Sequence, residues 1–332
     1  MGIPKVFIDG EAGTTGLQIY QRLATRQDLE VISIDPTKRK DANERAKLIN
    51  ASDVAILCLP DAAALEAVSW VTSPTTKVLD ASTAHRTAPD WAYGFPEMTA
   101  GQRQKIAESS RVSNPGCYPT GFLAAIAPLI STDTLPATFP ATVNAISGYS
   151  GGGKKMIAQY QGFRAEASAE SSGWAESKSP YSPYGLKFGH KHVKEMQQYS
   201  GLQHAPLFVP AVGDFEQGMV VQVPLPLWTL DQPPTGQQLH SILERHYRDE
   251  PFVQVLPYQD GNALRDGNFL EAKTAVNTNE VQLLVFANDD TQEALLVARL
   301  DNLGKGASGA AVQNLNIMLD LPETTGLGGD SH

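Results

Sequence analysis

Cys117 stands in a run whose composition suits a reactive thiol better than a packing residue. Ser-Asn-Pro-Gly precedes it and Tyr-Pro-Thr comes after it, and both are turn-forming combinations. The apolar segment 122–126 then predicts a helix that begins near Pro119. Backbone N–H groups and the dipole at a helix N-terminus favour the thiolate, which is the nucleophilic form of cysteine. The alternative is a small buried residue, the commoner fate of a free cysteine.

Two histidines, His190 and His192, form a second candidate for chemistry. A His-x-His pair can ligate a metal, but no second cluster of cysteine, histidine or carboxylate completes a site, so we expect no metal. A general acid or base fits better, because an unperturbed histidine titrates near pH 6.5, where thiol chemistry needs a proton carrier. The residue types leave open which of the two serves.

A glycine-rich run, Ser-Gly-Tyr-Ser-Gly-Gly-Gly-Lys-Lys at 147–155, is suited to an anion. Backbone N–H groups and two ammonium groups would hold the negative charge. The alternative is a flexible loop with solvated lysines, and the pattern favours neither.

The elements that must position these residues begin with a dinucleotide-binding unit. A strand at 5–9 runs into a turn with the spacing Gly-x-x-Gly-x-x-Gly, and apolar residues then recur at helical spacing from Leu17. Glycines let the backbone approach a pyrophosphate, and the helix N-terminus offers N–H groups to it. A plain strand-to-helix connection is the alternative. The expected cofactor-binding residues of this turn are Gly10, Ala12, Gly13, Thr14, Thr15 and Gly16.

The residues at the end of the second strand, 31–34, bear on the identity of the dinucleotide. Asp35 ends this strand about 20 residues past the glycine turn, where a carboxylate would hold a ribose 2′-hydroxyl and favour NAD. Lys38, Arg39 and Lys40 come next, and they would instead pair with a 2′-phosphate and favour NADP. An ordinary solvated basic turn is a third possibility.

Further strands at 54–60 and 77–80, with a helix at 61–70 between them, predict a doubly wound α/β sheet. We expect Cys58 to lie inside the first of these strands, in the core. Ligands of such sheets gather beyond the carboxyl ends of the strands, where Pro60 and Ser82 would lie.

After Cys117 the strands become longer and more often alternating or β-branched. This texture predicts an α+β domain with a mostly antiparallel sheet, interrupted by a helix at 236–248. We expect the last helix, 310–321, to return to the first domain. The predicted divisions are residues 1–117 with 303–325 for the dinucleotide-binding domain, 118–302 for the catalytic, substrate and oligomerisation domain, and 326–332 for a mobile tail with nothing to bury.

Composition narrows the function further. The chain has 332 residues, is 42% hydrophobic and carries a net charge of −10, which argues against a nucleic-acid partner. No signal peptide opens it, and no apolar run approaches the roughly 20 residues that cross a bilayer. With only two cysteines we expect a cytoplasmic protein whose thiols stay reduced.

Taken together, four segments resemble those of N-acetyl-γ-glutamyl-phosphate reductases of arginine biosynthesis, in their shorter form. They are the glycine turn, the Asn-Pro-Gly-Cys-Tyr-Pro-Thr run around Cys117, the Gly-His-Lys-His segment with Glu195, and Gly-Lys-Gly-Ala at 304–307. This family resembles aspartate-semialdehyde dehydrogenase in fold, with a Rossmann-type sheet. The resemblance covers nearly the whole chain.

The resemblance implies a role for each candidate. Cys117 would form a thioester, a histidine would move protons, with His192 favoured over His190, and NADP would carry the hydride in spite of Asp35. The expected cofactor-binding set therefore includes Asp35, Lys38, Arg39, Pro60, Ser82 and Asn302, the last for the nicotinamide amide. The expected substrate-binding set is Arg86, Asn114, Ser147, Lys154, Arg164 and Glu195. We also expect a small-molecule acyl phosphate substrate, no membrane partner and a homo-oligomer, either dimer or tetramer.

Two alternatives stay open from the residues alone. One is a sibling enzyme that uses the same chemistry on aspartyl phosphate or an aminoadipyl phosphate. The other is a non-catalytic dinucleotide sensor, against which an intact Cys117 argues, because a sensor needs no nucleophile.

Overall fold

The computed structural model describes residues 2–170 and 179–328, and for residues 163–170 it describes the backbone alone. The chain forms two compact units. The first runs to Gly116 and resumes at Ala307, and the second is Cys117–Gly306. The second unit therefore begins at the candidate nucleophile itself.

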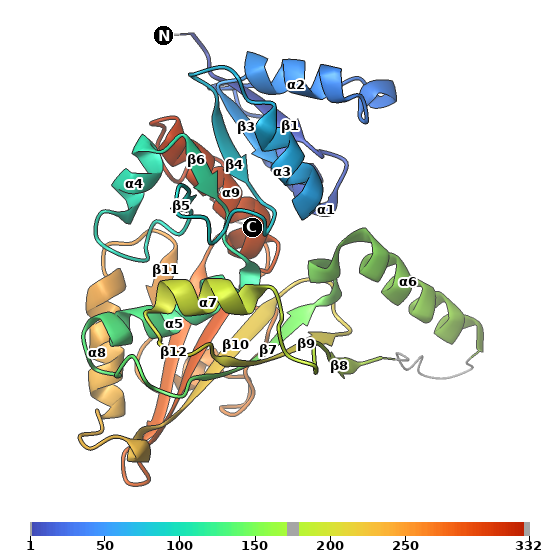
Figure 1. The fold of residues 1–332 in the computed structure, drawn as a ribbon. Coiled ribbons are helices and arrows are strands. Elements are labelled where there is room, and N and C mark those ends of the chain that lie inside the picture. The colour runs from blue at the N-terminus through green and yellow to red at the C-terminus, as the bar shows by residue number, and fades with distance from the viewer. Residues whose placement is uncertain (1, 171–178, 329–332) are drawn as a thin grey trace. The chain divides into compact units, whose positions relative to one another are not determined.

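The first unit is built on a six-stranded sheet, coloured blue to green in Figure 1, in which all neighbouring strands are parallel. The strand order, β2-β1-β3-β4-β6-β5, changes direction beside β1, as in a doubly wound fold. Among the described residues the strands are β1 (Lys5–Asp9), β2 (Glu30–Ile32), β3 (Val54–Leu57), β4 (Lys77–Asp80), β5 (Ala92–Tyr93) and β6 (Arg111–Ser113). This confirms the predicted parallel α/β sheet.

Helices cover this sheet because its strands are apolar on both faces. Phe7, Ala55 and Leu57 pack against α2 and α3 in one cluster, while Val6 and Ile56 are buried on the opposite face, where α1 and α9 pack. The helices are α1 (Thr14–Leu23), α2 (Ala42–Ala51), α3 (Asp61–Ser69), α4 (Gln102–Glu108) and α9 (Gly309–Met318). The sequence patterns predict α1, α3 and α9 but neither α2 nor α4.

Two details of the first unit differ from expectation. Cys58 lies one residue past the end of β3 rather than inside it, and its side chain is half-buried. Burial nevertheless raises the pKa of its thiol to about 12, with the charges of Asp80 and Asp9 adding to the effect. At the other end of the chain, Leu327 is only 3% exposed, whereas the sequence predicts nothing to bury in residues 326–332. Residues 329–332 lie outside the described residues.

The second unit contains a seven-stranded mixed sheet in the order β11-β12-β13-β10-β7-β9-β8. Four of its six neighbouring pairs are antiparallel, which confirms the predicted mostly antiparallel sheet. In the described part of the chain its strands are β7 (Thr142–Gly148), β8 (Tyr181–Pro183), β9 (Leu207–Gly213), β10 (Met219–Pro226), β11 (Val253–Val255), β12 (Val281–Asn288) and β13 (Glu293–Leu300).

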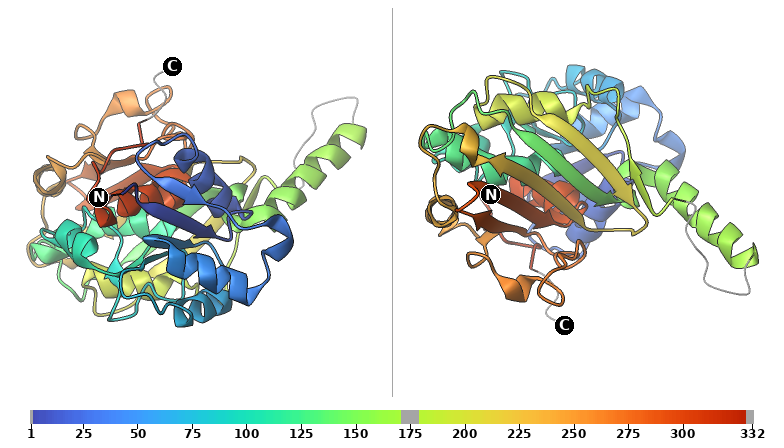
Figure 2. Two further views of the ribbon diagram at one scale, coloured as in Figure 1. Left: turned by 90° about the horizontal axis from the view of Figure 1, so that it is seen from above. Right: turned by 90° about the horizontal axis from the view of Figure 1, so that it is seen from below.

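One helix, α5 (Cys117–Ser131), lies against β10, β12 and β13 of this sheet, and α7 (His192–Ser200) and α8 (Gly236–Tyr247) pack on it. Every residue of α5 from Tyr118 to Ile130 is buried, so the helix forms the core of the unit. The glycine-rich run at 147–155 is not an open loop. It forms a short 3₁₀ turn, η2 (Tyr149–Gly152), and then α6 (Gly153–Glu170), which extends away from the sheet of its unit in both views of Figure 2.

Short 3₁₀ or π turns connect several of these elements: η1 (Pro36–Lys38), η3 (Leu227–Thr229), η4 (Gly261–Ala263) and η5 (Gly304–Ser308). Within residues 2–170 and 179–328, no helix has the length and hydropathy needed to span a bilayer.

Candidate active site

Cys117 is the first residue of α5, two positions before the predicted start of the helix. It forms no disulfide and is half-buried. The backbone at Gly306 approaches it closely, since a Cβ on Gly306 would lie 2.9 Å from the Cys117 Cβ. Only glycine fits there without displacing the nucleophile. A thiol at the first position of a fifteen-residue helix receives the helix dipole and the free N–H groups of the first turn.

His190 and His192 lie together beside Tyr118, the neighbour of Cys117 in the chain. The two imidazole centroids are 4.7 Å apart, and those of His190 and His192 are 6.2 Å and 5.9 Å from the Tyr118 ring centroid. His192 is the first residue of α7 and is 7% exposed, whereas His190 precedes the helix and is half-buried. The structure thus brings both predicted histidines to the start of α5.

The two rings differ in protonation chemistry. His190 Nδ1 lies 3.2 Å from the backbone N–H of His192 and accepts a hydrogen bond from it, so the neutral ring carries its proton on Nε2. Burial lowers the pKa of His190, and the neighbouring charge of Lys191 lowers it further. A smaller fraction of His190 is therefore protonated at neutral pH than of an ordinary histidine, so less of it can donate a proton.

Two tyrosine hydroxyls complete this cluster, and the sequence patterns assign a role to neither. The Tyr184 hydroxyl donates to the Tyr118 hydroxyl at 3.2 Å, and the Tyr118 hydroxyl donates to the Ala211 carbonyl at 3.3 Å. Tyr118 stands inside the cysteine motif, which is a usable signal. Tyr184 comes directly after the short strand β8, and no pattern around it points to the site.

Glu195 and Ser147, two predicted substrate contacts, are both buried in the second unit. Glu195 is 1% exposed and lies three residues after His192 on α7, hence on the same side of that helix. Ser147 is 2% exposed in β7, and its hydroxyl donates to the Gly148 carbonyl at 3.0 Å.

Asn302, the predicted contact of the nicotinamide amide, is buried and links the start of β10 to η2. Its amide oxygen accepts from the Gly218 N–H at 2.9 Å, and its amide nitrogen donates to the Ser150 hydroxyl at 3.0 Å. One N–H of the amide is left for a further partner, so a contact to a nicotinamide amide would use that N–H alone.

Lys154 and Arg86, two basic side chains predicted to bind the anionic substrate, belong to different units and differ in exposure. Lys154 is exposed in the first turn of α6, and the side chain of Arg164 lies outside the described residues. Arg86 belongs to the first unit, where it is 8% exposed and its Nη2 donates to the Ala81 carbonyl at 3.3 Å. Asn114 is also buried in the first unit. Its amide donates to the Ala307 carbonyl at 3.0 Å and accepts from the Asn314 amide at 3.1 Å.

The glycine turn of the first unit has the geometry of an anion cradle. Gly10 has a φ of +91°, which favours glycine, and a Cβ there would lie within van der Waals overlap of the Cys58 carbonyl oxygen. A Cβ on Gly16 would overlap the Gly10 carbonyl oxygen in the same way, so the helix packs directly on the turn. Gly13 caps α1 with no side-chain hydrogen bond. The N–H groups of the first turn, around Thr14 and Thr15, are therefore open to a ligand.

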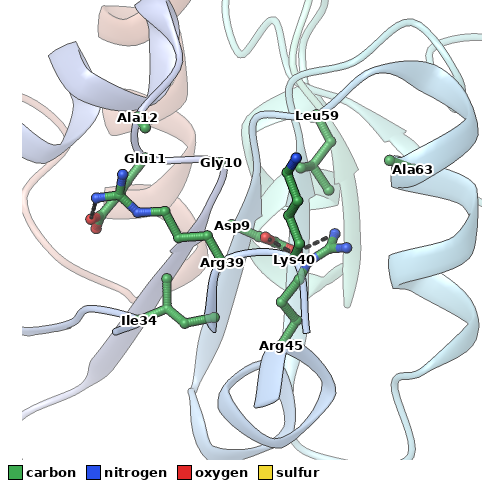
Figure 3. A pocket seen from close by; sticks show the side chains of 10 residues that line it. All are labelled: Asp9, Gly10, Glu11, Ala12, Ile34, Arg39, Lys40, Arg45, Leu59 and Ala63. Atoms are coloured by element: carbon green, nitrogen blue, oxygen red, sulfur yellow. Dashed lines mark hydrogen bonds and ion pairs between the residues drawn. The ribbon is translucent and has the colours of Figure 1, made fainter. Parts of the chain in front are cut away.

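A pocket opens beside this turn, at the carboxyl ends of β1 and β3 (Figure 3). Three basic side chains line it, from Arg39, Lys40 and Arg45. Arg45 is buried and forms a bidentate pair with Asp9, with Arg45 Nη2 2.9 Å from Asp9 Oδ2. The remaining residues that line the pocket are Gly10, Glu11, Ala12, Ile34, Leu59 and Ala63.

The side chains of the basic turn after β2 point in different directions. Arg39 lines the pocket, and its Nη2 lies 3.4 Å from Glu11 Oε1. Lys40 lines it as well, whereas Lys38 pairs with Glu44 at 3.7 Å and is absent from the ten lining residues. Asp35 is absent too, because its carboxylate caps η1 by accepting from the Thr37 N–H at 2.8 Å. That hydrogen bond lowers the pKa of Asp35.

Pro60 and Ser82 lie beyond the strand ends, where the fold predicts ligands. Pro60 is exposed and directly precedes α3. Ser82 is buried, and its hydroxyl donates to Asp80 Oδ2 at 2.7 Å. The same carboxylate oxygen lies 2.6 Å from His85 Nδ1, and the His85 ring stacks on Trp91 with centroids 4.0 Å apart. This buried cluster shapes the loop that carries Arg86.

The sequence and the fold match a known class of proteins. Residues 5–108 match the family model described as semialdehyde dehydrogenase, NAD binding domain, and residues 117–302 match the model described as semialdehyde dehydrogenase, dimerisation domain. The chain belongs to the semialdehyde dehydrogenase family. Solved structures agree at the level of the fold. The chain superposes on aspartate semialdehyde dehydrogenase II from Vibrio cholerae with a TM-score of 0.72 at 13% identity. The alignment covers 96% of this chain and 99% of that one.

Curated relatives give a narrower match. The chain is 65% identical to N-acetyl-gamma-glutamyl-phosphate reductase 2 of Nostoc sp., over 98% of this chain and 100% of that protein. It is 51% identical to the N-acetyl-gamma-glutamyl-phosphate reductase of Mesorhizobium japonicum, over 96% of this chain and 99% of that protein.

Proposed function

We propose that this chain reduces N-acetyl-γ-glutamyl phosphate to N-acetylglutamate 5-semialdehyde and phosphate, with NADPH as reductant, as a step of arginine biosynthesis. The observation that carries the proposal is the position of the Cys117 thiol at the first residue of α5, with His190 and His192 beside its chain neighbour Tyr118. The full-length identity to reductases of this name supports the choice of substrate.

The first half-reaction is acyl transfer to Cys117. The thiolate attacks the acyl carbon, a C–S bond forms, the bond from that carbon to the phosphate oxygen breaks, and phosphate leaves. The N–H groups of the first turn of α5 stabilise the negative charge that develops on the carbonyl oxygen. The product is a thioester on Cys117.

The second half-reaction reduces that thioester. NADPH supplies the hydride when it is bound. His192 gives a proton to the oxygen as the thiohemiacetal forms. The hydroxyl proton then returns to His192 as the C–S bond breaks, which releases the semialdehyde and leaves Cys117 as the thiolate. His192 suits this role better than His190, because the pKa of His190 is lowered and its Nδ1 is already an acceptor.

The first unit fits a nicotinamide dinucleotide phosphate. The tight turn at Gly10 and Gly16 and the uncapped start of α1 suit a pyrophosphate. Arg39 and Lys40 line the adjoining pocket and would pair with a 2′-phosphate, while Asp35 is turned away to cap η1. This arrangement favours NADP over NAD.

Positive side chains would hold the anionic groups of the substrate. Arg86 suits a phosphate or carboxylate, because a guanidinium binds either in a bidentate fork. Lys154 and Arg164 stay candidates for the second anion, and Glu195 would orient His192 from one turn along α7. Asn114 and Ser147 remain proposed contacts of the substrate.

We further place the protein in the cytoplasm as a homo-oligomer, a dimer or tetramer. Neither cysteine forms a disulfide, which suits a reducing compartment, and residues 117–302 match a dimerisation domain.

The reverse reaction offers a direct assay. Purified protein is given N-acetylglutamate semialdehyde, phosphate and NADP, and the formation of NADPH is monitored. Phosphate-dependent reduction of NADP supports the proposal. Faster turnover with aspartate semialdehyde would identify a sibling enzyme, and binding of NADP without turnover of either would identify a sensor.

A further inference from the structure

Tyr184 is fixed at the point where three elements of the second unit meet. Its backbone N–H donates to the Pro210 carbonyl of β9 at 3.0 Å. Its hydroxyl reaches the Tyr118 hydroxyl at 3.2 Å, 66 positions away in the sequence. Tyr118 comes immediately after Cys117 in the first turn of α5, so the bond joins the segment after β8 to the turn that carries the nucleophile.

The same two rings contact the histidines. The Tyr184 and His190 centroids are 5.8 Å apart in an edge-to-face arrangement, and Tyr118 meets His190 in the same way at 6.2 Å. Such aromatic pairs are geometrically specific, so they fix the orientation of the imidazole. His190 Nδ1 in turn accepts a hydrogen bond from the backbone N–H of His192. Tyr184 therefore helps to hold the first residue of α7 in place, through its contact with the His190 ring.

The thiol lies within electrostatic range of both hydroxyls. Burial raises the pKa of Tyr184 to about 12 and that of Tyr118 well above its usual value, and the charge of Cys117 raises both further. The other titratable groups around the pair are His190 and His192, and Ser147 of β7 hydrogen-bonds Tyr118. Both tyrosines therefore stay protonated, and the chain of hydrogen bonds from Tyr184 through Tyr118 to the Ala211 carbonyl is maintained at neutral pH.

We propose that Tyr184 is a positioning residue of the Cys117 site. Its hydroxyl ties the first turn of α5 to the segment that carries His190 and His192, and so holds the Cys117 thiol at the helix N-terminus, whose dipole and N–H groups stabilise the thiolate. This rests on the proposed function for the effect on turnover. The effect on the reactivity of the thiol is independent of the substrate.

Tyr184→Phe tests the proposal, because it keeps the ring contacts and removes only the hydroxyl. We expect kcat to fall about tenfold, equivalent to about 1.4 kcal/mol, while KM for NADPH stays within about twofold. We also expect the apparent pKa of Cys117 to rise by about one unit. It is measured from the pH dependence of iodoacetamide alkylation, with the Cys117 peptide quantified by mass spectrometry.

Tyr181→Phe is the matched control, since Tyr181 begins β8, the short strand that directly precedes Tyr184, and its side chain is 58% exposed. It should change neither kcat nor the alkylation profile. A Tyr184→Phe protein with wild-type kcat and wild-type alkylation pKa would overturn the proposal. If Tyr184→Phe does not fold, Tyr118→Phe removes the same hydrogen bond from its other end, and the same two measurements decide.

The double variant, Tyr118→Phe with Tyr184→Phe, shows whether the two hydroxyls act through one hydrogen bond or contribute to activity independently. If the hydroxyls act through one another, Tyr118→Phe with Tyr184→Phe loses no more activity than the worse single variant. Multiplied losses would contradict the proposal. Failure of the proposed function would give a different result. The wild-type protein would then be inactive toward N-acetylglutamate semialdehyde, but Tyr184→Phe would still raise the alkylation pKa of Cys117 above the wild-type value.

Discussion

His190 Nδ1 accepts a hydrogen bond of 3.2 Å from the backbone N–H of His192, and the two rings lie 4.7 Å apart. The relationship makes the histidines chemically unequal although the sequence presents them as a symmetrical His-x-His pair. A ring nitrogen that accepts from the backbone holds no proton of its own. His190 thus contacts the first residue of α7, and we propose His192 as the proton carrier.

Replacement of each histidine by Asn should separate these roles. Acylation expels phosphate, a good leaving group, whereas the thiohemiacetal oxygen needs a proton. His192→Asn should therefore slow reduction of the thioester more than its formation, by about 10²- to 10⁴-fold, and the acyl-enzyme should accumulate in single-turnover experiments. His190→Asn should show a milder defect, mainly in substrate affinity. The reverse pattern would exchange the roles, and full activity in both variants would refute them.

The pKa of His190 predicts one component of the pH dependence of stability. Its folded-state pKa lies below the ordinary value of 6.5, so folding favours the neutral ring. The associated stability is present above pH 6.5 and is lost as the pH falls through the folded-state pKa. Melting temperatures measured between about pH 5 and 7 should fall less steeply with acid in His190→Asn, whose side-chain oxygen can still accept from the His192 N–H. Identical slopes would show that His190 titrates alike in the folded and unfolded chains.

Cys117→Ser should abolish turnover and leave the fold and NADP binding intact, because a serine hydroxyl without a strong base is a far weaker nucleophile than a thiolate. Cys58→Ser is the matched control. Burial raises the pKa of Cys58 to about 12, so this thiol is protonated at neutral pH and its loss should leave the protein active, though less stable. Equal loss of activity in the two variants, at equal NADP affinity, would remove Cys117 from its role.

Because Arg39 and Lys40 line the pocket beside the glycine turn, we expect these two residues to select NADPH over NADH. Neutralising Arg39 and Lys40 together should raise KM for NADPH by about tenfold or more and leave KM for NADH nearly unchanged, since only NADPH carries the 2′-phosphate. Lys38→Ala serves as control, because Lys38 pairs with Glu44 instead of lining the pocket. If both cofactors weaken alike in the Arg39 and Lys40 variant, these residues do not bind the 2′-phosphate.

The parts of the fold that the sequence predicts well are those governed by local patterns. The strand at Lys5–Asp9, its glycine turn and α1 succeed one another within a single stretch, and apolar runs such as Val54–Leu57 mark buried parallel strands. The helix at Cys117 is predictable for the same reason, since an apolar segment comes after turn residues. Its first residue differs from the prediction by two positions, because the cysteine itself carries no strong helix signal.

The features that escape prediction from the sequence depend on contacts between distant residues. Tyr184 reaches Tyr118 across 66 positions, and only the sheet that pairs β8 with β9 brings them together. Lys40 lines the pocket beside the glycine turn, whereas Lys38 pairs with Glu44, and both pairings depend on how the turn after η1 folds. Short amphipathic helices such as α7 have too few turns for a periodic signal. In each case the amino-acid type is visible in the sequence and the direction of its side chain is not.

The reverse reaction tests the central claim most directly. Initial rates of NADP reduction are compared for N-acetylglutamate semialdehyde and aspartate semialdehyde, each with and without phosphate. We predict turnover that requires phosphate, is lost in Cys117→Ser and is much faster with the N-acetylated substrate. Faster turnover of aspartate semialdehyde, or turnover that persists in Cys117→Ser, would contradict this prediction.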